Sequence, residues 1–243
     1  MKKFAKIFAL AALMFVGGQA MAQTRGAMFL GASFPMKEFA QFDGVNSFAL
    51  SSNGNEAGAG IGFNVGFKWY YNVGVKGLNV LLSLDGMYNG LNDEAKDFYK
   101  SRKSALDLLG SNVSTSTPKY INVPLMIGVN YILRLTPQFG IYAEAGLGGN
   151  ARFITNYTEK YTDNLLNVRH TATVDFATKL GFAWQVGAGF EVARNLVIGC
   201  SFYNLGETAV KAEKTGDIIS TPAPSDGSAI KPVMVLGRIG FCF

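Results

Sequence analysis

The chain has few of the residues on which catalytic and metal sites depend. It contains one histidine, His170, and two cysteines, Cys200 and Cys242. Two cysteines are too few for a disulfide framework or a cysteine-based metal cage. No P-loop, metal-ligand cluster or catalytic triad is recognisable. We therefore expect no metal and no cofactor, and we expect both cysteines to be free thiols.

Long hydrophobic runs are missing after residue 22, although 49% of the chain is hydrophobic. A transmembrane helix needs about 20 consecutive apolar residues. The one apolar run near the start, Ile7 to Val16, would rise only about 15 Å as a helix, which is too short for a membrane anchor. Three lysines flank its start, and Ala20-Met21-Ala22 supplies small residues after it. This order predicts a cleaved signal peptide at residues 1–22 and one mature domain at residues 23–243.

Charge of one sign is not in strong excess once that segment is removed. The formal net charge falls from +5 to +2, because the three lysines leave with the signal peptide. No basic cluster and no aromatic-basic stripe remains. The chain therefore gives no reason to expect a nucleic-acid partner.

Alternation of apolar and polar residues is what the chain has in place of long apolar runs. From Gly60 to Tyr70, large apolar side chains occupy every second position, and glycine or polar residues stand between them. Period-two alternation is typical of β-strands. Comparable or weaker alternation marks seven further segments, which begin near Gly26, Leu78, Tyr120, Phe139, Phe176, Leu196 and Val233.

The connections between these eight segments alternate in length. Those after the second, fourth and sixth are short, whereas four long ones cover about Pro35 to Glu56, Gly90 to Thr117, Ile154 to Val174 and Leu205 to Ala229. Short turns at one end and long loops at the other are typical of outer-membrane barrels. We predict an all-β fold, an eight-stranded antiparallel transmembrane up-and-down β-barrel with four long extracellular loops and short periplasmic turns. A soluble carrier barrel would need its large apolar residues inside, but here they form one stripe, which we assign to lipid.

We expect the long loops to be ordinary surface loops, with one exception. Asn92 is an N-cap type residue followed by Asp93 and Glu94, and Gly110 ends the pattern. This order predicts a short amphipathic helix. The helix could rest on the barrel rim or dock a partner.

Six ionisable residues fall on the predicted inner face, three of each sign. They are Lys68, Asp85, Glu144, Lys179, Glu191 and Arg238. A narrow lumen desolvates charges, so unpaired ones would be costly and we expect them to pair across the barrel. Such a network would keep the lumen plugged. The alternative is a gated or weakly conducting pore lined by the same residues.

Catalysis has one candidate base, His170, with Asp163 and Asp175 nearby in sequence. No nucleophile motif surrounds it. We therefore expect no enzyme, and an outer-membrane enzyme acting on lipid or peptide stays as a lesser alternative.

Several short segments carry a family resemblance. They are Tyr120 to Leu125, Tyr142 to Gly149, Gly187 to Glu191 and Leu236 to Phe243. In these segments the chain resembles the small outer-membrane barrels common in Bacteroidetes, called "porin family" or OmpA/OmpX-like. The resemblance implies an integral barrel of a Gram-negative cell envelope. Pro124, inside a strand, would then mark a tolerated bulge or bend.

The last predicted strand ends on alternating apolar residues, with Val235, Ile239, Phe241 and Phe243 on one face. This ending resembles the signal read by the barrel-assembly machinery. The expected partners are that machinery, periplasmic chaperones during biogenesis, outer-membrane lipid and an extracellular partner of the loops, with the barrel itself a monomer.

Size favours a structural or surface-interaction role over a small-solute porin. Side chains fill the interior of an eight-stranded barrel, whereas open porins use about sixteen strands.

Overall fold

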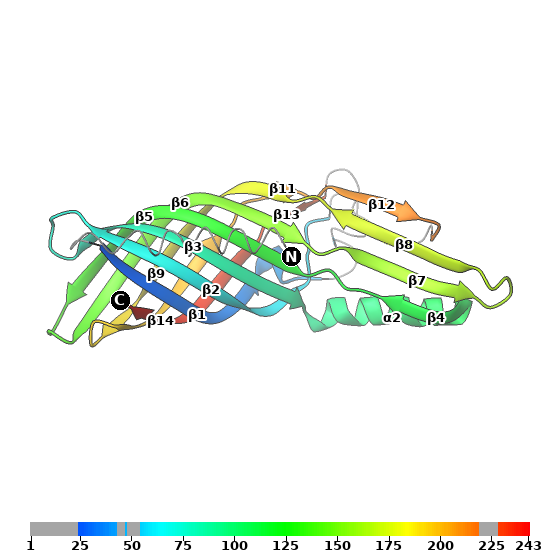
Figure 1. Ribbon diagram of the computed structural model, residues 1–243, viewed down its shortest axis with the longest axis horizontal. Helices are drawn as coiled ribbons and strands as arrows, with labels where there is room; N and C mark the ends of the chain where they lie inside the picture. The colour runs from blue at the N-terminus through cyan, green and yellow to red at the C-terminus, as the bar shows by residue number, and fades with distance from the viewer. Residues whose placement is uncertain (1–23, 43–46, 48–53, 219–227) are drawn as a thin grey trace.

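Eight antiparallel strands close into a barrel in the computed structural model, which describes residues 24–42, 47, 54–218 and 228–243. The predicted signal peptide lies outside these residues. The barrel order is β1-β14-β10-β9-β6-β5-β3-β2 (Figure 1). The barrel strands are β1 (Thr24–Met36), β2 (Ala59–Asn72), β3 (Leu78–Leu91), β5 (Tyr120–Arg134), β6 (Phe139–Ile154), β9 (Lys179–Val192), β10 (Leu196–Asn204) and β14 (Val233–Cys242). The predicted fold class is confirmed.

The first and last strands close the barrel. β1 pairs with β14 from Ala27↔Cys242 to Met36↔Val233, and its other edge pairs with β2. The connections at 73–77, 135–138 and 193–195 are short. β1 begins and β14 ends beside these turns, where the Gly26 N–H donates to the Phe243 carbonyl at 3.0 Å. This end is periplasmic in barrels of this type.

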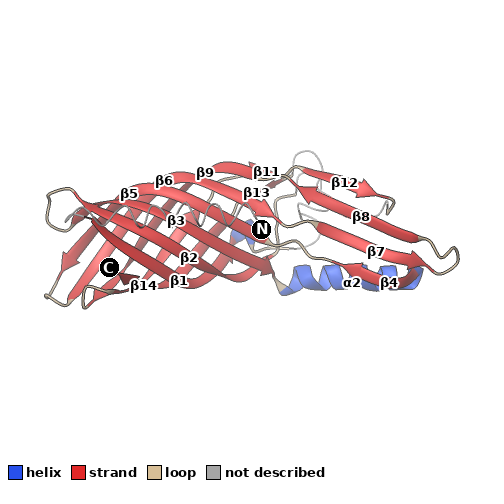
Figure 2. Ribbon diagram, in the orientation of Figure 1, coloured by secondary structure: helices blue, strands red, loops and turns tan. Residues whose placement is uncertain are grey.

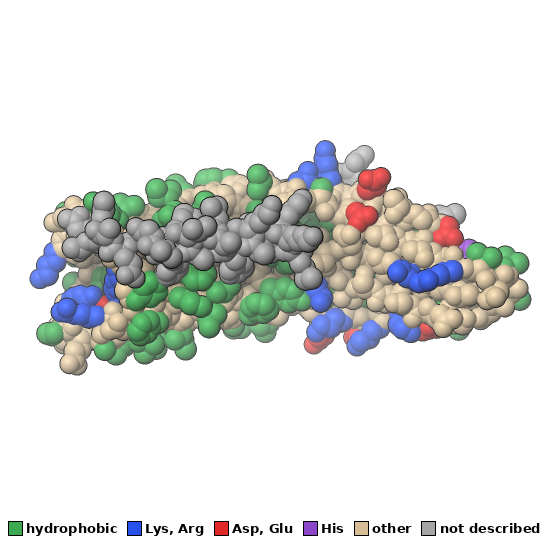
Figure 3. All heavy atoms as spheres, in the orientation of Figure 1, with side chains coloured by type: hydrophobic (Ala, Val, Ile, Leu, Met, Phe, Trp, Pro, Cys, Tyr) green, Lys and Arg blue, Asp and Glu red, His purple; other side chains and the backbone are tan. Residues whose placement is uncertain are grey.

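Alternation separates an apolar outside from a packed inside. Ile127 is 63% exposed on the outer face, and its ladder neighbours Leu82 and Leu147 are exposed with it. The residues between them, such as Ser83 and Met126, point inward and are fully buried. Figure 3 shows hydrophobic side chains spread over the barrel half of the molecule. Large apolar side chains exposed over a whole barrel suit hydrocarbon.

The interior holds more large side chains than the sequence pattern indicated. Tyrosine, methionine, leucine and phenylalanine pack inside with the polar residues, among them Phe29, Leu81, Met87, Tyr120, Met126, Tyr142, Tyr203 and Leu236. Glycine and short polar side chains line the lumen as the alternation predicts, and the larger side chains fill space between them. Glycines make room for larger neighbours: a Cβ on Gly199 would lie 2.0 Å from the Tyr142 hydroxyl.

A second sheet continues the barrel beyond its long-loop end. Its strands, in the order β12-β8-β7-β4, are β12 (Ala212–Gly216), β8 (Arg169–Phe176), β7 (Tyr157–Asp163) and β4 (Gly110–Thr115). Three long connections supply them, so the expectation of plain surface loops was wrong (Figure 2). We call this sheet, together with helix α2 (Asp93–Leu109), the extracellular extension.

The extension keeps the register of the barrel. Beyond Tyr120↔Ile154 in the β5–β6 ladder, the Thr155 N–H donates to the Lys119 carbonyl at 3.0 Å, and the Ser116 N–H donates to the Thr158 carbonyl at 2.9 Å. The β4–β7 ladder follows directly, from Thr115↔Glu159. β4 and β7 are therefore a hydrogen-bonded continuation of the β5–β6 hairpin.

The predicted helix is confirmed as α2. The Asn92 side chain caps its start by accepting from the Ala95 N–H at 2.8 Å, and Gly110 follows its last residue. Ala95, Tyr99 and Leu106 are buried on one face of α2, which contacts β4 and β7. The remaining short elements are the 3-10 helix η2 (Lys37–Phe39) and the pair β11 (Thr208–Ala209) and β13 (Ala229–Ile230).

Two details of the predicted strands need correction: where β9 begins, and the bulge that was one of the two options at Pro124. Phe176 ends β8, where it pairs with Ala212, and β9 begins only at Lys179. Pro124 causes no register shift, because Leu84↔Leu125 and Met87↔Asn122 keep one register on either side of it. A missing N–H removes ladder bonds without adding a residue, so the strand stays in step.

Placing a charged residue on the apolar outer face of the barrel tests whether that face contacts lipid. We expect Ile127→Lys to lower the free energy of unfolding in lipid vesicles by about 2–4 kcal/mol, because an ammonium near mid-membrane loses its hydration. The measurement is denaturant unfolding followed by tryptophan fluorescence. Ser111→Lys, on an exposed position of β4, is the matched control. Equal small losses for both would contradict the lipid assignment.

Candidate functional site

Four of the six predicted lumen charges meet in the middle of the barrel. Lys68 of β2 forms an ion pair with Glu144 of β6, and both side chains are fully buried. Arg238 of β14 donates to Asp85 at 2.8 Å and lies 3.5 Å from Glu144. The four charges therefore balance, as a desolvated lumen requires.

Uncharged groups complete this central network. The Tyr203 hydroxyl donates to the second Asp85 oxygen at 2.8 Å, and Arg238 donates to the Ser201 hydroxyl at 2.6 Å. The Arg238 guanidinium also lies 5.2 Å from the centre of the Phe29 ring. Hydrogen bonds and a ring face thus surround the buried guanidinium.

The other two predicted residues lie at opposite ends of the lumen. Glu191 lies near the short turns, where Arg25 of β1 and Arg134 of β5 each contact one of its oxygens at 2.6 Å. Lys179 lies at the extracellular end, in register with Arg152, and forms no ion pair with any described residue. The six residues are therefore two separate clusters and one isolated lysine.

Sequence reasoning missed Arg25 and Arg134. The inner residues of β1 include Ala27 and Phe29, so the same alternation carried two positions back places Arg25 inside. Arg134 likewise continues the even-numbered inner face of β5. The period-two alternation therefore contains the signal that places both arginines on the inner face.

A buried ion pair fastens the helix of the extension to its sheet. Arg102 of α2 donates two hydrogen bonds to Glu159 of β7, each 3.0 Å long, and the Glu159 side chain is fully buried. The Tyr157 hydroxyl also donates to Glu159. Burial raises the pKa of the neighbouring Tyr99 hydroxyl, and the Glu159 carboxylate raises it further. A bidentate pair in a buried setting fixes the position of α2 on the sheet.

The far end of the extension exposes leucines to water. Leu165 is 94% exposed in the turn between β7 and β8, and Leu108 is 86% exposed at the end of α2. The two segments meet because Gly110, directly after α2, pairs with Asp163 at the start of that turn. The exposed apolar residues at this end, which we call the leucine tip, are Leu108, Leu109, Leu165, Leu166 and Val168 (Figure 3).

His170 lies on β8 beside an acid that sequence proximity did not indicate. Its Nδ1 is 2.5 Å from an Asp217 oxygen, and the Tyr161 ring stacks on its imidazole at 4.9 Å. The Thr171 N–H lowers the pKa of Asp217 by hydrogen bonding, and His170 adds to that effect. Asp175 instead accepts a hydrogen bond from Asn156.

The cysteines and the residues of the proposed C-terminal signal lie as the alternation predicts. Cys200 is exposed, Cys242 is buried, and both are free. Ile239, Phe241 and Phe243 are exposed on the outer face, and Val235 is partly exposed on the same face.

Neither a metal cluster nor an apolar spanning helix occurs in the part of the chain that the structure describes. No three His, Cys, Asp or Glu side chains there are grouped to hold a metal ion. No helix there is long and apolar enough to cross a membrane.

The closed barrel, its apolar belt and its charged interior define a small integral β-barrel membrane protein. The sequence matches the model of the family described as "Outer membrane protein beta-barrel domain" over residues 8–212. The chain belongs to this family, and its location is the bacterial outer membrane. No curated protein matches it significantly.

Solved structures with a similar arrangement are distant in sequence. The attachment invasion locus protein Ail of Yersinia pestis is 14% identical, with 91% of this chain and 99% of that one covered and a TM-score of 0.41. Neisserial surface protein A is 10% identical, covering 91% and 96%, with a TM-score of 0.43. OprG of Pseudomonas aeruginosa is 11% identical, covering 90% and 94%, with a TM-score of 0.41.

The central ion pair should be costly to break on one side only. We expect Lys68→Met to destabilise the barrel by about 3–5 kcal/mol, because it leaves the Glu144 carboxylate buried with less compensating charge. Adding Glu144→Gln should recover part of that loss, which a double-mutant cycle of unfolding free energies measures. Strictly additive losses would contradict direct coupling of the two side chains.

Proposed function

We propose that this protein is a closed outer-membrane barrel whose function is to hold a binding surface away from the cell. The extracellular extension with its leucine tip is the observation that carries this proposal. The barrel, in this view, is an anchor that passes no solute and catalyses no reaction.

The packed interior supports a closed lumen. The Lys68–Glu144 and Arg238–Asp85 pairs cross the middle, with Phe29 and Tyr203 against them. Near the extracellular mouth, Arg152 of β6 donates to the Ile230 carbonyl at 2.7 Å and the Thr208 carbonyl at 2.9 Å, which ties both ends of the connection between β10 and β14 to β6. An eight-stranded barrel filled in this way leaves no room for a wide aqueous path.

The construction of the extension supports a surface role. Its ladders continue those of the barrel, and the Arg102–Glu159 pair holds its helix, so the leucine tip stands on a rigid support. Exposed apolar patches on an otherwise polar surface mark sites of interaction. A rigid support also lowers the entropy lost when a partner binds.

The leucine tip can be tested by photo-crosslinking on living cells. A photoreactive amino acid at position 166 should give a discrete adduct, and the same amino acid at Lys100, an exposed residue of α2, should not. Adding Leu165→Ser should lower the adduct yield at least about fivefold, because truncating a central contact residue removes much of the binding energy. Leu165→Met is the matched control and should keep the adduct.

Two crosslinking outcomes would contradict a surface role of the tip. One is the absence of any adduct at position 166 in correctly folded protein. The other is equal labelling at positions 166 and 100, which would indicate unspecific collisions.

The rival function, a small-solute channel, is tested by conductance. We expect no sustained current from the purified barrel in a planar bilayer, because ion pairs and large side chains fill its lumen. Heat-modifiable gel mobility verifies folding, and the variant with both Met87 and Met126 replaced by alanine, which removes buried volume, is the control for detection. Steady single-channel steps from the wild type would favour the channel.

The same proposal includes how the barrel reaches its membrane. The outward face of β14, with Ile239, Phe241 and Phe243, is suited to be read by the barrel-assembly machinery, after signal-peptide cleavage and passage with periplasmic chaperones. The inserted barrel is then a monomer surrounded by lipid.

A further inference from the structure

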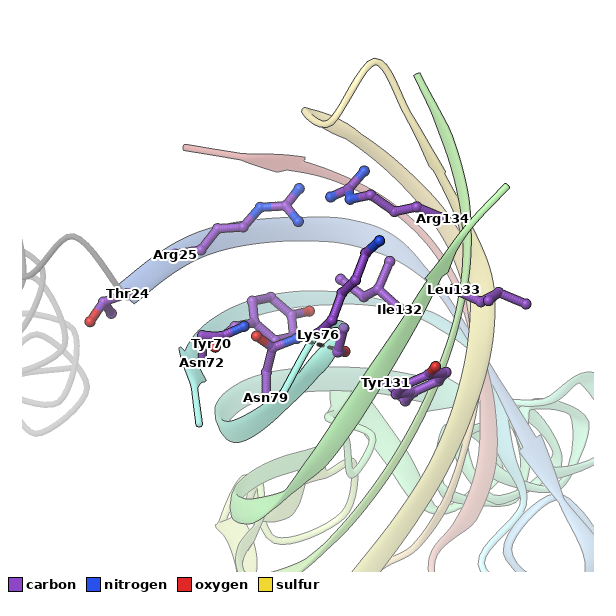
Figure 4. A pocket seen from close by; sticks show the side chains of 11 residues that line it. Thr24, Arg25, Tyr70, Asn72, Lys76, Asn79, Tyr131, Ile132, Leu133 and Arg134 are labelled. Atoms are coloured by element: carbon purple, nitrogen blue, oxygen red, sulfur yellow. Dashed lines mark hydrogen bonds between the residues drawn. The ribbon is translucent and has the colours of Figure 1, made fainter. Parts of the chain in front are cut away.

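The periplasmic end of the barrel opens into a cavity of about 770 Å³. We propose that this cavity binds a phosphate monoester, a ligand with a phosphoryl dianion. Figure 4 shows Arg25 of β1 and Arg134 of β5 extending toward each other across the space, with Lys76 extending toward them from the β2–β3 turn.

Cations exceed acids at this cavity. Arg25, Lys76 and Arg134 line it, and no aspartate or glutamate is among its described lining residues. The nearest acid, Glu191, is buried and already uses both oxygens, one for each arginine at 2.6 Å. Glu191 therefore compensates one of the three positive charges that line the cavity, which leaves an excess of two among the side chains of the lining residues and Glu191.

The excess is not explained by the fold alone. Pairing Glu191 requires one guanidinium, but two are supplied, and Lys76 has no ion pair with any described residue. Glu191 lies between the two guanidiniums, but its single charge does not offset the repulsion among all three cations unless a further anion binds. Both guanidiniums are also reachable, since the Arg25 and Arg134 side chains are 25% and 32% exposed.

A phosphoryl dianion suits this arrangement better than a carboxylate. Its two negative charges match the excess of two, and its oxygens accept the forked donors of guanidinium groups. Arg134 donates one hydrogen bond to Glu191, and each guanidinium has five N–H donors. Tyr70 lines the same space, and the cavity is much larger than a phosphate ion, so an ester substituent fits beside the charged groups.

Binding is measured by calorimetric titration of the folded protein in a maltoside detergent free of phosphate. Glycerol 3-phosphate is the probe, and glycerol and succinate are the matched neutral and dicarboxylate compounds. We expect saturable binding of glycerol 3-phosphate that weakens with salt, weaker binding of succinate and none of glycerol.

Lys76→Gln should raise the dissociation constant about tenfold, because it removes one charge-assisted contact without touching Glu191. Arg194→Gln is the matched control, since the Arg194 side chain is an exposed cation of the same rim that does not line the cavity, and the substitution keeps the backbone carbonyl that accepts from Arg25. Its effect should stay below about twofold. Equal weakening by both variants, or no saturable binding, would overturn the proposal.

Nanodiscs distinguish the two sources of such a ligand. If a lipid headgroup occupies the cavity, phosphatidic acid in the nanodisc should compete with glycerol 3-phosphate in the wild type and less in Lys76→Gln. If the ligand is a soluble ester, phosphatidic acid should leave its affinity as it is in phosphatidylcholine.

Discussion

A backbone in hydrocarbon must satisfy its own hydrogen bonds, and the rest of this structure depends on that constraint. Lipid offers no partner for an N–H or a carbonyl, so an open sheet edge is excluded. The pairing of β1 with β14 removes the last edge. Closure with eight strands also fixes a narrow interior, and every second side chain must enter it. The crowding of side chains in the lumen is therefore a consequence of how the backbone hydrogen bonds are satisfied.

Burial makes the lumen charges interdependent. Arg238 contacts Asp85 and lies near Glu144, while Glu144 pairs with Lys68, so no member can be removed without leaving another uncompensated. The cluster at Glu191 is different, because it lies where the lumen meets water and carries more cations than its acid requires. The central network has equal numbers of positive and negative charges, which suits a structural role. The Glu191 cluster has an excess of positive charge at the periplasmic mouth, which suits a binding site.

Alternation was sufficient to predict the barrel but not what extends from it. The barrel strands carry an apolar stripe, which predicted their number, and the alternating short and long connections predicted their order and direction. Strand Tyr157–Asp163 carries no apolar stripe, because the face that it buries against α2 is made of Tyr157 and the ion-paired Glu159, so period-two hydrophobicity gives no signal there. Arg25 and Arg134 were missed for a different reason: they continue the inner face of their strands at the strand ends beside the short turns. Which lumen charges meet depends on strand register, and one sequence does not encode register visibly.

The surrounding medium, more than residue type, decides what an exposed leucine means here. Leu147 on the belt and Leu165 at the tip are both exposed, yet the first faces lipid and loses nothing by it. The second faces water, where burying it against a partner is favourable by about 1.5–3 kcal/mol. Because the β4–β7 ladder is a continuation of the β5–β6 hairpin, the tip inherits the rigidity of a barrel that cannot open its edge. The constraint that closes the barrel in lipid thus also holds the leucine tip in water.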